Sequence, residues 1–171
     1  MKKIILFLFA ILLSGSIYAQ QGDLSFGVKG SYVTVYKDLL YGLDLSYHIA
    51  DPLEISISQL INPSVTKEDE FNSEYDEKLG LYSTNLDLRY YLLLQRSWAT
   101  GPILGGQYLF VKNKESDIYN INAFGFNIGW HLRINLTDHL KINGSWRYTN
   151  GQDETSHHAF SLGLCYTINL F

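Results

Sequence analysis

Apolar and polar residues alternate with a period of two along most of the chain after its first twenty residues. Successive side chains of a β-strand point to opposite faces, so this alternation is typical of strands with one apolar and one polar face. No helical pattern of useful length occurs after residue 19. The sequence therefore predicts an all-β fold built from eight alternating segments. They cover residues 24–34, 41–49, 53–58, 82–92, 98–110, 124–134, 140–148 and 160–170.

The connections between these segments differ in length in a regular way. The connections after the second, fourth and sixth segments are short turns, at residues 50–52, 95–97 and 136–138. The connections after the third, fifth and seventh are longer and polar, at residues 63–80, 112–120 and 150–157. An even number of antiparallel strands with short turns at one rim and long loops at the other is typical of an up-and-down transmembrane β-barrel. Both termini then lie on the periplasmic side, with the short turns.

The aromatic residues of the apolar face gather at the two ends of the predicted strands, with aliphatic residues between them. The group expected near the long loops is Tyr32, Tyr41, Tyr82, Tyr108, Phe110, Phe124, Tyr148 and Phe160. The group expected near the short turns is Phe26, Tyr47, Tyr90, Trp98 and Tyr166. Two aromatic girdles around an aliphatic band are typical of a surface that crosses a bilayer. The pattern favours an apolar face pointing outward into lipid; the alternative, a secreted lipocalin-like binding barrel, would turn that face inward.

The polar face carries charges of both signs among serine, glycine and asparagine. An eight-stranded barrel has room inside for side chains but no open channel. Because an isolated buried charge is costly, these residues are expected to pair in a salt-bridge and hydrogen-bond network. They are Lys29, Asp44, His48, Glu54, Asp87, Arg89, His131, Arg133, Lys141 and Arg147. Cys165, the only cysteine, shares this inward phase and is expected to be an inert packing residue.

The first 19 residues resemble a secretory signal peptide. Lys2 and Lys3 precede the apolar run Ile4–Leu13, which is too short to span a bilayer as a helix. The sequence predicts a signal peptide at 1–19 and an outer-membrane β-barrel domain at 20–171, with an uncleaved membrane anchor as the alternative to cleavage. Removing the two lysines leaves 11 basic against 17 acidic residues, a net charge of −6, which disfavours nucleic acid as a partner.

With this architecture the chain resembles the small eight-stranded outer-membrane proteins of the OmpA/OmpX type. The shared element is a C-terminal strand that ends in an aromatic residue, which in that group is recognised by the barrel-assembly machinery. Its matching positions here are Phe160, Leu162, Gly163, Leu164, Tyr166, Ile168 and Phe171. One departure is that the apolar phase ends on Leu170, so Phe171 is one step out of register. The "YAQQ" junction is similar to signal-peptide ends common in Bacteroidota.

The resemblance implies an integral outer-membrane barrel that is a monomer. Its implied partners are outer-membrane lipid and lipopolysaccharide, and the barrel-assembly machinery through the C-terminal strand. A cluster of acidic residues lies in the longest loop, and we expect it to be a solvated surface; cation bridging to lipopolysaccharide phosphates or capture of a basic partner is the alternative. The cluster is Glu68, Asp69, Glu70, Glu74, Asp76 and Glu77.

One short stretch is similar to a catalytic motif. Lipid A deacylases of the PagL type carry a His-x-Ser-Asn motif late in the barrel, with an acidic residue after it. The stretch 147–151 here, "RYTNG", has Arg147 at the position of the base and Thr149 at that of the nucleophile, with Asp153 and Glu154 following. Arginine stays protonated and does not accept the hydroxyl proton. We therefore expect no catalytic residue, and a lipid A deacylase-like enzyme is the alternative.

The histidines do not form an obvious metal site. His157 and His158 are adjacent on a strand and so point to opposite faces, and we expect an interfacial role for them. His48 and His131 share the inward phase and are expected to be hydrogen-bonded interior residues. The sequence thus predicts no metal ligands, no cofactor and no enzymatic activity. It favours a barrel with a filled polar interior that acts in envelope structure or through its surface loops.

Overall fold

The computed structural model describes residues 22–67, 77–95, 97–113, 121–151 and 156–169 of the chain. Within these ranges the chain forms nine β-strands and no helix that could cross a membrane. The strands are β1 (Asp23–Val33), β2 (Asp38–Ala50), β3 (Leu53–Lys67), β4 (Glu77–Tyr90), β5 (Leu93–Leu94), β6 (Trp98–Asn113), β7 (Ile121–Asn135), β8 (Leu140–Gly151) and β9 (His157–Asn169). Eight of them correspond to the eight predicted segments, and β5 is a two-residue addition that pairs with β6.

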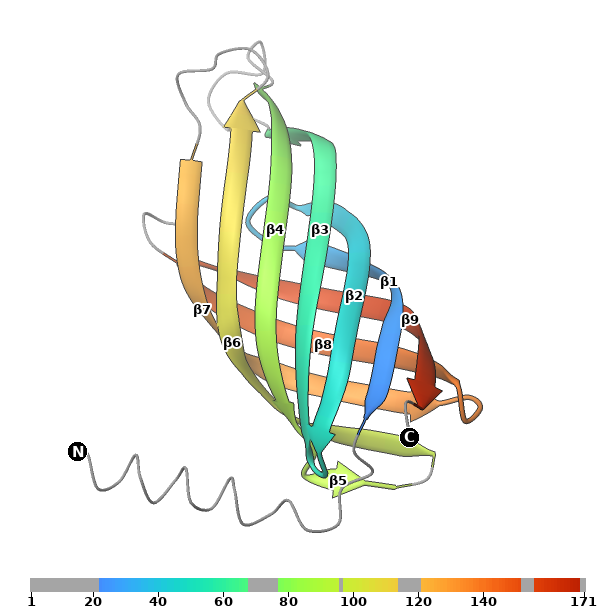
Figure 1. Cartoon of the computed structure of the whole chain (residues 1–171). Helices are drawn as coiled ribbons and strands as arrows, with labels where there is room; N and C mark the ends of the chain where they lie inside the picture. Colours follow the sequence, from blue (N-terminus) through green and yellow to red (C-terminus); the bar gives the residue numbers. More distant parts are fainter. Residues whose placement is uncertain (1–21, 68–76, 96, 114–120, 152–155, 170–171) are drawn as a thin grey trace, which may run out of the picture.

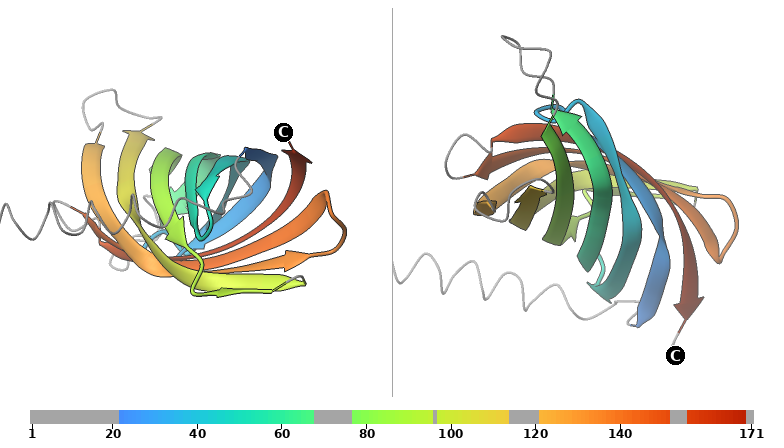
Figure 2. Two further views of the ribbon diagram at one scale, coloured as in Figure 1. Left: turned by 60° about the horizontal axis from the view of Figure 1, so that its bottom comes forward. Right: turned by 90° about the horizontal axis from the view of Figure 1, so that it is seen from above.

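The strands close into a barrel (Figure 1). Each long strand pairs antiparallel with its neighbour in sequence, and β4 pairs with β6 directly, past β5. The closing pair is β1 with β9, from Asp23 opposite Asn169 to Val33 opposite Ala159. Figure 2 shows the strands curving around a common interior. The predicted eight-stranded antiparallel up-and-down barrel is therefore confirmed.

Several strands are longer than their predicted segments, most of all β3. The third segment was expected to end at Ser58, but β3 continues to Lys67, and its partner β4 begins at Glu77. The register between these strands shifts between Asn62 and Val65, around the proline at position 63. Proline has no N–H to donate to a ladder, so a bulge is the place where a strand accommodates it. The bulge lets pairing continue into a stretch that the sequence assigned to a loop.

The two faces of the barrel differ sharply in polarity. In β1, Val28 is 60 % exposed and the adjacent Lys29 only 6 %. The same alternation runs through the other long strands, with large apolar side chains outside and most charged ones inside. A water-soluble barrel has the opposite arrangement, and a soluble protein rarely exposes so much contiguous apolar surface. The lipocalin-like alternative is therefore wrong.

Inward-facing glycines allow the wall to bend tightly. A Cβ atom added to Gly42 would overlap the carbonyl oxygen of Gln59 on β3, and one added to Gly129 would overlap that of Trp146 on β8. Only glycine permits such a close approach of neighbouring backbones. These positions therefore help a barrel of few strands to close.

Candidate functional site

The lumen holds all ten charged and histidine residues that the sequence assigned to the polar face. Their exposed fractions lie between 1 % for Asp87 and 7 % for His48, Arg133 and Lys141. Each lumen cation lies within 4.0 Å of a carboxylate oxygen. The expected buried salt-bridge network is therefore confirmed.

The network is densest around Glu54 on β3. Its two carboxylate oxygens accept hydrogen bonds from Arg89 Nη1 at 2.7 Å, Tyr91 Oη at 2.8 Å and Arg133 Nη1 at 3.2 Å. Arg89 Nη2 also donates to Asp44 at 3.2 Å. Charge-assisted hydrogen bonds of this kind are the strong ones, and they offset the cost of burying four ionised groups.

Tyr91 lies at the turn-side end of the lumen and was not among the residues that the sequence placed there. It is 3 % exposed, its hydroxyl accepts from Arg133 Nη1 at 3.0 Å, and the Arg133 guanidinium carbon lies 4.3 Å from its ring centroid. The ring of His131 meets it edge-on with centroids 4.6 Å apart, and that of His48 stacks at 5.7 Å. The alternation of the strand could have placed it there, because Tyr91 lies two positions after the inward-facing Arg89.

A second group of polar contacts spans the lumen further toward the loops. Arg147 Nη2 on β8 lies 2.6 Å from Asp87 Oδ2 on β4. Asn127 Nδ2 donates to Asp87 Oδ1 at 3.2 Å, and Thr149 Oγ1 donates to Asn127 Oδ1 at 2.8 Å. The two contacts to Asp87 join strands that are not neighbours in the sheet, and the Thr149–Asn127 bond links the neighbouring strands β8 and β7, so the group fills the cross-section of the barrel.

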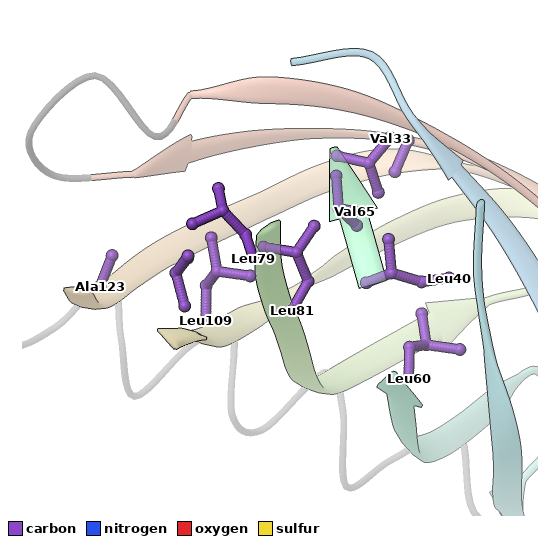
Figure 3. Close-up of a cluster of buried hydrophobic side chains, with 10 residues drawn as sticks. Val33, Leu40, Leu60, Val65, Leu79, Leu81, Leu109 and Ala123 are labelled. Carbon is purple, nitrogen blue, oxygen red and sulfur yellow. The ribbon is translucent and has the colours of Figure 1, made fainter. Parts of the chain in front are cut away.

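Apolar side chains occupy the loop-side end of the lumen (Figure 3). We call this group the apolar cap. It consists of Val33, Leu40, Leu60, Val65, Leu79, Leu81, Leu109, Val111, Ala123 and Ala159. Tyr36 in the β1–β2 loop packs against it, and burial raises the pKa of its phenol. The prediction of a polar interior is thus correct toward the turns and incomplete toward the loops.

The stretch 147–151 contributes alternate residues to this lumen. Arg147 and Thr149 face inward and are 2 % exposed, whereas Asn150 is exposed. His157 lies directly opposite Thr149 in the ladder, but the Thr149 hydroxyl donates to Asn127 instead. Arg147 and Thr149, at the positions of the base and the nucleophile, are therefore engaged in packing and hydrogen bonding inside the barrel. The acidic residues at 153 and 154 lie outside the described residues.

The adjacent pair His157 and His158 and the cysteine lie where their phase predicts. His157 is 3 % exposed while His158 is exposed on the other face, so the two do not share one ion. In the described part of the chain, no three histidine, cysteine, aspartate or glutamate side chains are placed to hold a metal ion. Cys165 is 2 % exposed, and Asn143 Nδ2 lies 3.2 Å from its Sγ. Of the acidic cluster, the members within 68–76 lie outside the described residues, and Glu77 is the first residue of β4.

The outer face carries the expected aromatic residues at both ends. Tyr108 packs against Phe124 on the loop side with ring centroids 4.8 Å apart, and Phe26 packs against Tyr166 on the turn side at 5.8 Å. Polar groups on this face bond to one another: Trp130 Nε1 donates to Thr100 Oγ1 at 2.7 Å. Such pairing is what a surface without water requires.

Comparison with known proteins points in the same direction. A family model described as "Outer membrane protein beta-barrel domain" matches residues 5–167. No curated protein matches the chain.

Several solved structures are similar in fold. The N-terminal β-barrel domain of Pseudomonas aeruginosa OprF has a TM-score of 0.65 at 18 % identity, covering 86 % of this chain and 98 % of that one. Ail of Yersinia pestis has a TM-score of 0.56 at 17 % identity, covering 86 % and 99 %. A major outer membrane protein of Thermus thermophilus has a TM-score of 0.59 at 12 % identity, covering 86 % and 99 %. At these identities the similarity concerns the fold.

Proposed function

Since the chain belongs to the outer membrane protein β-barrel domain family, we propose that it is a non-enzymatic barrel of the bacterial outer membrane with a sealed lumen. It acts in envelope structure or through contacts of its surface loops. The observation that carries this proposal is the filling of the lumen at two levels, an ion-paired network toward the turns and the apolar cap toward the loops.

The ion-paired network and the apolar cap block passage through the lumen in different ways. Ions that enter from the turn side meet side chains already paired across the lumen, such as Asp87 with Arg147. Water that enters from the loop side meets the cap, in which Leu81 and Val65 have no exposed surface. A hydrophobic constriction of this kind blocks conduction by excluding water. Both levels together support a barrel that passes no solute.

The placement of Arg147 and Thr149 favours the non-enzymatic role over the deacylase-like one. A deacylase needs a nucleophile with an adjacent base and access to a lipid ester. Here the Thr149 hydroxyl donates a hydrogen bond to an asparagine oxygen, and the residue is only 2 % exposed. Arg147 is held by Asp87 and has no basic lone pair to offer.

Export and assembly form part of the same proposal. Residues 1–19 act as the signal peptide, and the C-terminal strand with Phe171 is recognised by the barrel-assembly machinery. Outer-membrane lipid and lipopolysaccharide surround the monomer. Deleting Phe171 should lower the yield in the outer membrane more than it lowers the stability of the refolded barrel.

Two measurements test the proposed function. The purified protein is added to planar lipid bilayers beside a general porin as positive control, and we expect no conductance above that of the bare bilayer. Stepwise, reproducible conductance would contradict a sealed lumen. Lipid A is then compared by mass spectrometry from cells with and without the protein. Identical spectra are expected; a deacylated species that disappears in Thr149→Ala would establish the enzymatic alternative.

A further inference from the structure

The outer face of the barrel is hollowed at Gly30 on β1. This residue lies opposite Tyr41 on β2 and Leu162 on β9, in the loop-side half of its strand. A Cβ atom added there would have its nearest atom, the Leu162 carbonyl oxygen, 4.0 Å away, so the position opens into free space. The large outward side chains of the neighbouring residues therefore surround a position that has no side chain.

The hollow is part of an open groove of about 660 Å³ that crosses β8, β9, β1 and β2. Its floor is Gly30 together with the main chain at the inward-facing positions 29, 42 and 163. Its walls are the outward side chains of Val28, Tyr41, Leu43, Ile142, Leu162 and Leu164. All but the tyrosine hydroxyl are apolar, and Leu162 and Leu43 are 66 % and 67 % exposed.

We propose that this groove binds one acyl chain of a lipid from the surrounding bilayer. The groove is continuous with the apolar outer face, which acyl chains cover in a membrane-spanning barrel. The groove is open on its outer side, so an acyl chain can enter it directly from the bilayer. A chain lying along Gly30 replaces the side chain that this position lacks and contacts walls on both sides, so it is held longer than chains on the convex parts of the wall.

A second copy of the protein is a weaker occupant. A stable interface buries about 800 Å² on each partner. Two convex barrels touch along a narrow line, whereas a flexible acyl chain follows a groove of any direction. The groove also runs across four strands, so a neighbouring barrel would have to insert a protruding side chain to reach its floor.

Native mass spectrometry tests the proposal directly. The protein is reconstituted in nanodiscs of palmitoyl-oleoyl phosphatidylethanolamine and phosphatidylglycerol and released gently in the spectrometer. We compare the wild type with Gly30→Leu, which fills the groove. The matched control is Gly106→Leu, another outward-facing glycine on β6 and away from the groove, where an added Cβ atom would make only an ordinary contact of 3.7 Å with the Gly125 carbonyl oxygen. Heat-modifiable migration on gels confirms that each variant is folded.

We expect a wild-type population that carries one phospholipid. Gly30→Leu should lower that fraction about tenfold, since displacing roughly two methylene groups from an apolar site changes binding by about this factor. Gly106→Leu should retain the wild-type fraction. Should Gly30→Leu fail to fold, Leu162→Trp places a larger side chain across the same floor and is expected to give the same loss.

Three results would overturn the acyl-chain site. They are no retained lipid in the wild type, equal retention in the wild type and the groove-filling variants, and equal loss in Gly106→Leu. A wild-type dimer that Gly30→Leu converts to monomer would assign the groove to a second copy and would overturn it as well.

Discussion

The guanidinium of Arg147 lies 2.6 Å from the carboxylate of Asp87, although β8 and β4 are separated by two other long strands in the sheet. The pair therefore crosses the lumen and ties opposite parts of the wall together. Both side chains are almost fully buried, at 2 % and 1 % exposure.

Removing one member of this pair should destabilise the barrel strongly. Asp87→Asn leaves Arg147 buried beside a neutral amide, and breaking a buried pair costs about 3–5 kcal/mol. Urea unfolding of the barrel refolded in vesicles, followed by tryptophan fluorescence, measures the change. The control is Asp138→Asn in the exposed β7–β8 turn. The double variant Asp87→Leu with Arg147→Met should be more stable than Asp87→Asn, because no charge is left buried without a partner. If Asp87→Asn were as stable as the control Asp138→Asn, a structural role for the pair would be contradicted.

Tyr91 should matter through its hydroxyl as well as its ring. Tyr91→Phe keeps the ring contacts with His131 and His48 but removes the hydrogen bonds to Glu54 and Arg133. Hydrogen bonds to charged groups contribute about 1.5–3 kcal/mol, so a loss of this size is expected in the free energy of unfolding. Tyr90→Phe, on the neighbouring outward-facing residue, serves as control and should change stability little. A Tyr91→Phe variant as stable as Tyr90→Phe would show that the hydroxyl contributes little and that the ring contacts alone matter.

The apolar cap should behave as a protein core, unlike the outer face. Leu81→Ala removes a side chain with no exposed surface, and such truncations cost about 2–5 kcal/mol because a cavity remains. Leu88→Ala on the same strand removes an outward side chain that is 37 % exposed, where detergent or lipid fills the space. Unfolding titrations of both variants in one detergent should show the larger loss for Leu81→Ala. The opposite order would argue against a packed cap.

Cys165 reports which face points inward. Because its thiol is buried in the lumen, the folded protein should resist alkylation by maleimides and should react fully once unfolded in urea. A Cys165→Ser protein with Leu164→Cys moves the thiol one residue along β9 to the outer face, where a lipid-soluble maleimide should label it in the folded state. Mass spectrometry counts the adducts. Rapid labelling of Cys165 in the folded barrel would contradict the inward phase.

The strand pattern and the two faces of the barrel follow from the sequence alone. Alternation depends on the geometry of a single strand, in which each side chain points opposite to the one before it. Residues such as Lys29, Glu54 and Arg147 could therefore be placed inside, and the short turns and long loops indicated a transmembrane barrel. Tyr91 could have been placed inside by the same rule, because it lies two residues after the inward-facing Arg89.

The tertiary structure alone decided which side chains meet in the lumen and where the outer face is hollowed. Which inward residues meet depends on the stagger between strands and on closure, which no single strand encodes. The Asp87–Arg147 pair crosses the barrel for this reason, and in the apolar cap Val33 on β1 gathers with Leu81 and Leu109 from the paired strands β4 and β6. The groove at Gly30 likewise exists only because its walls come from four strands at once.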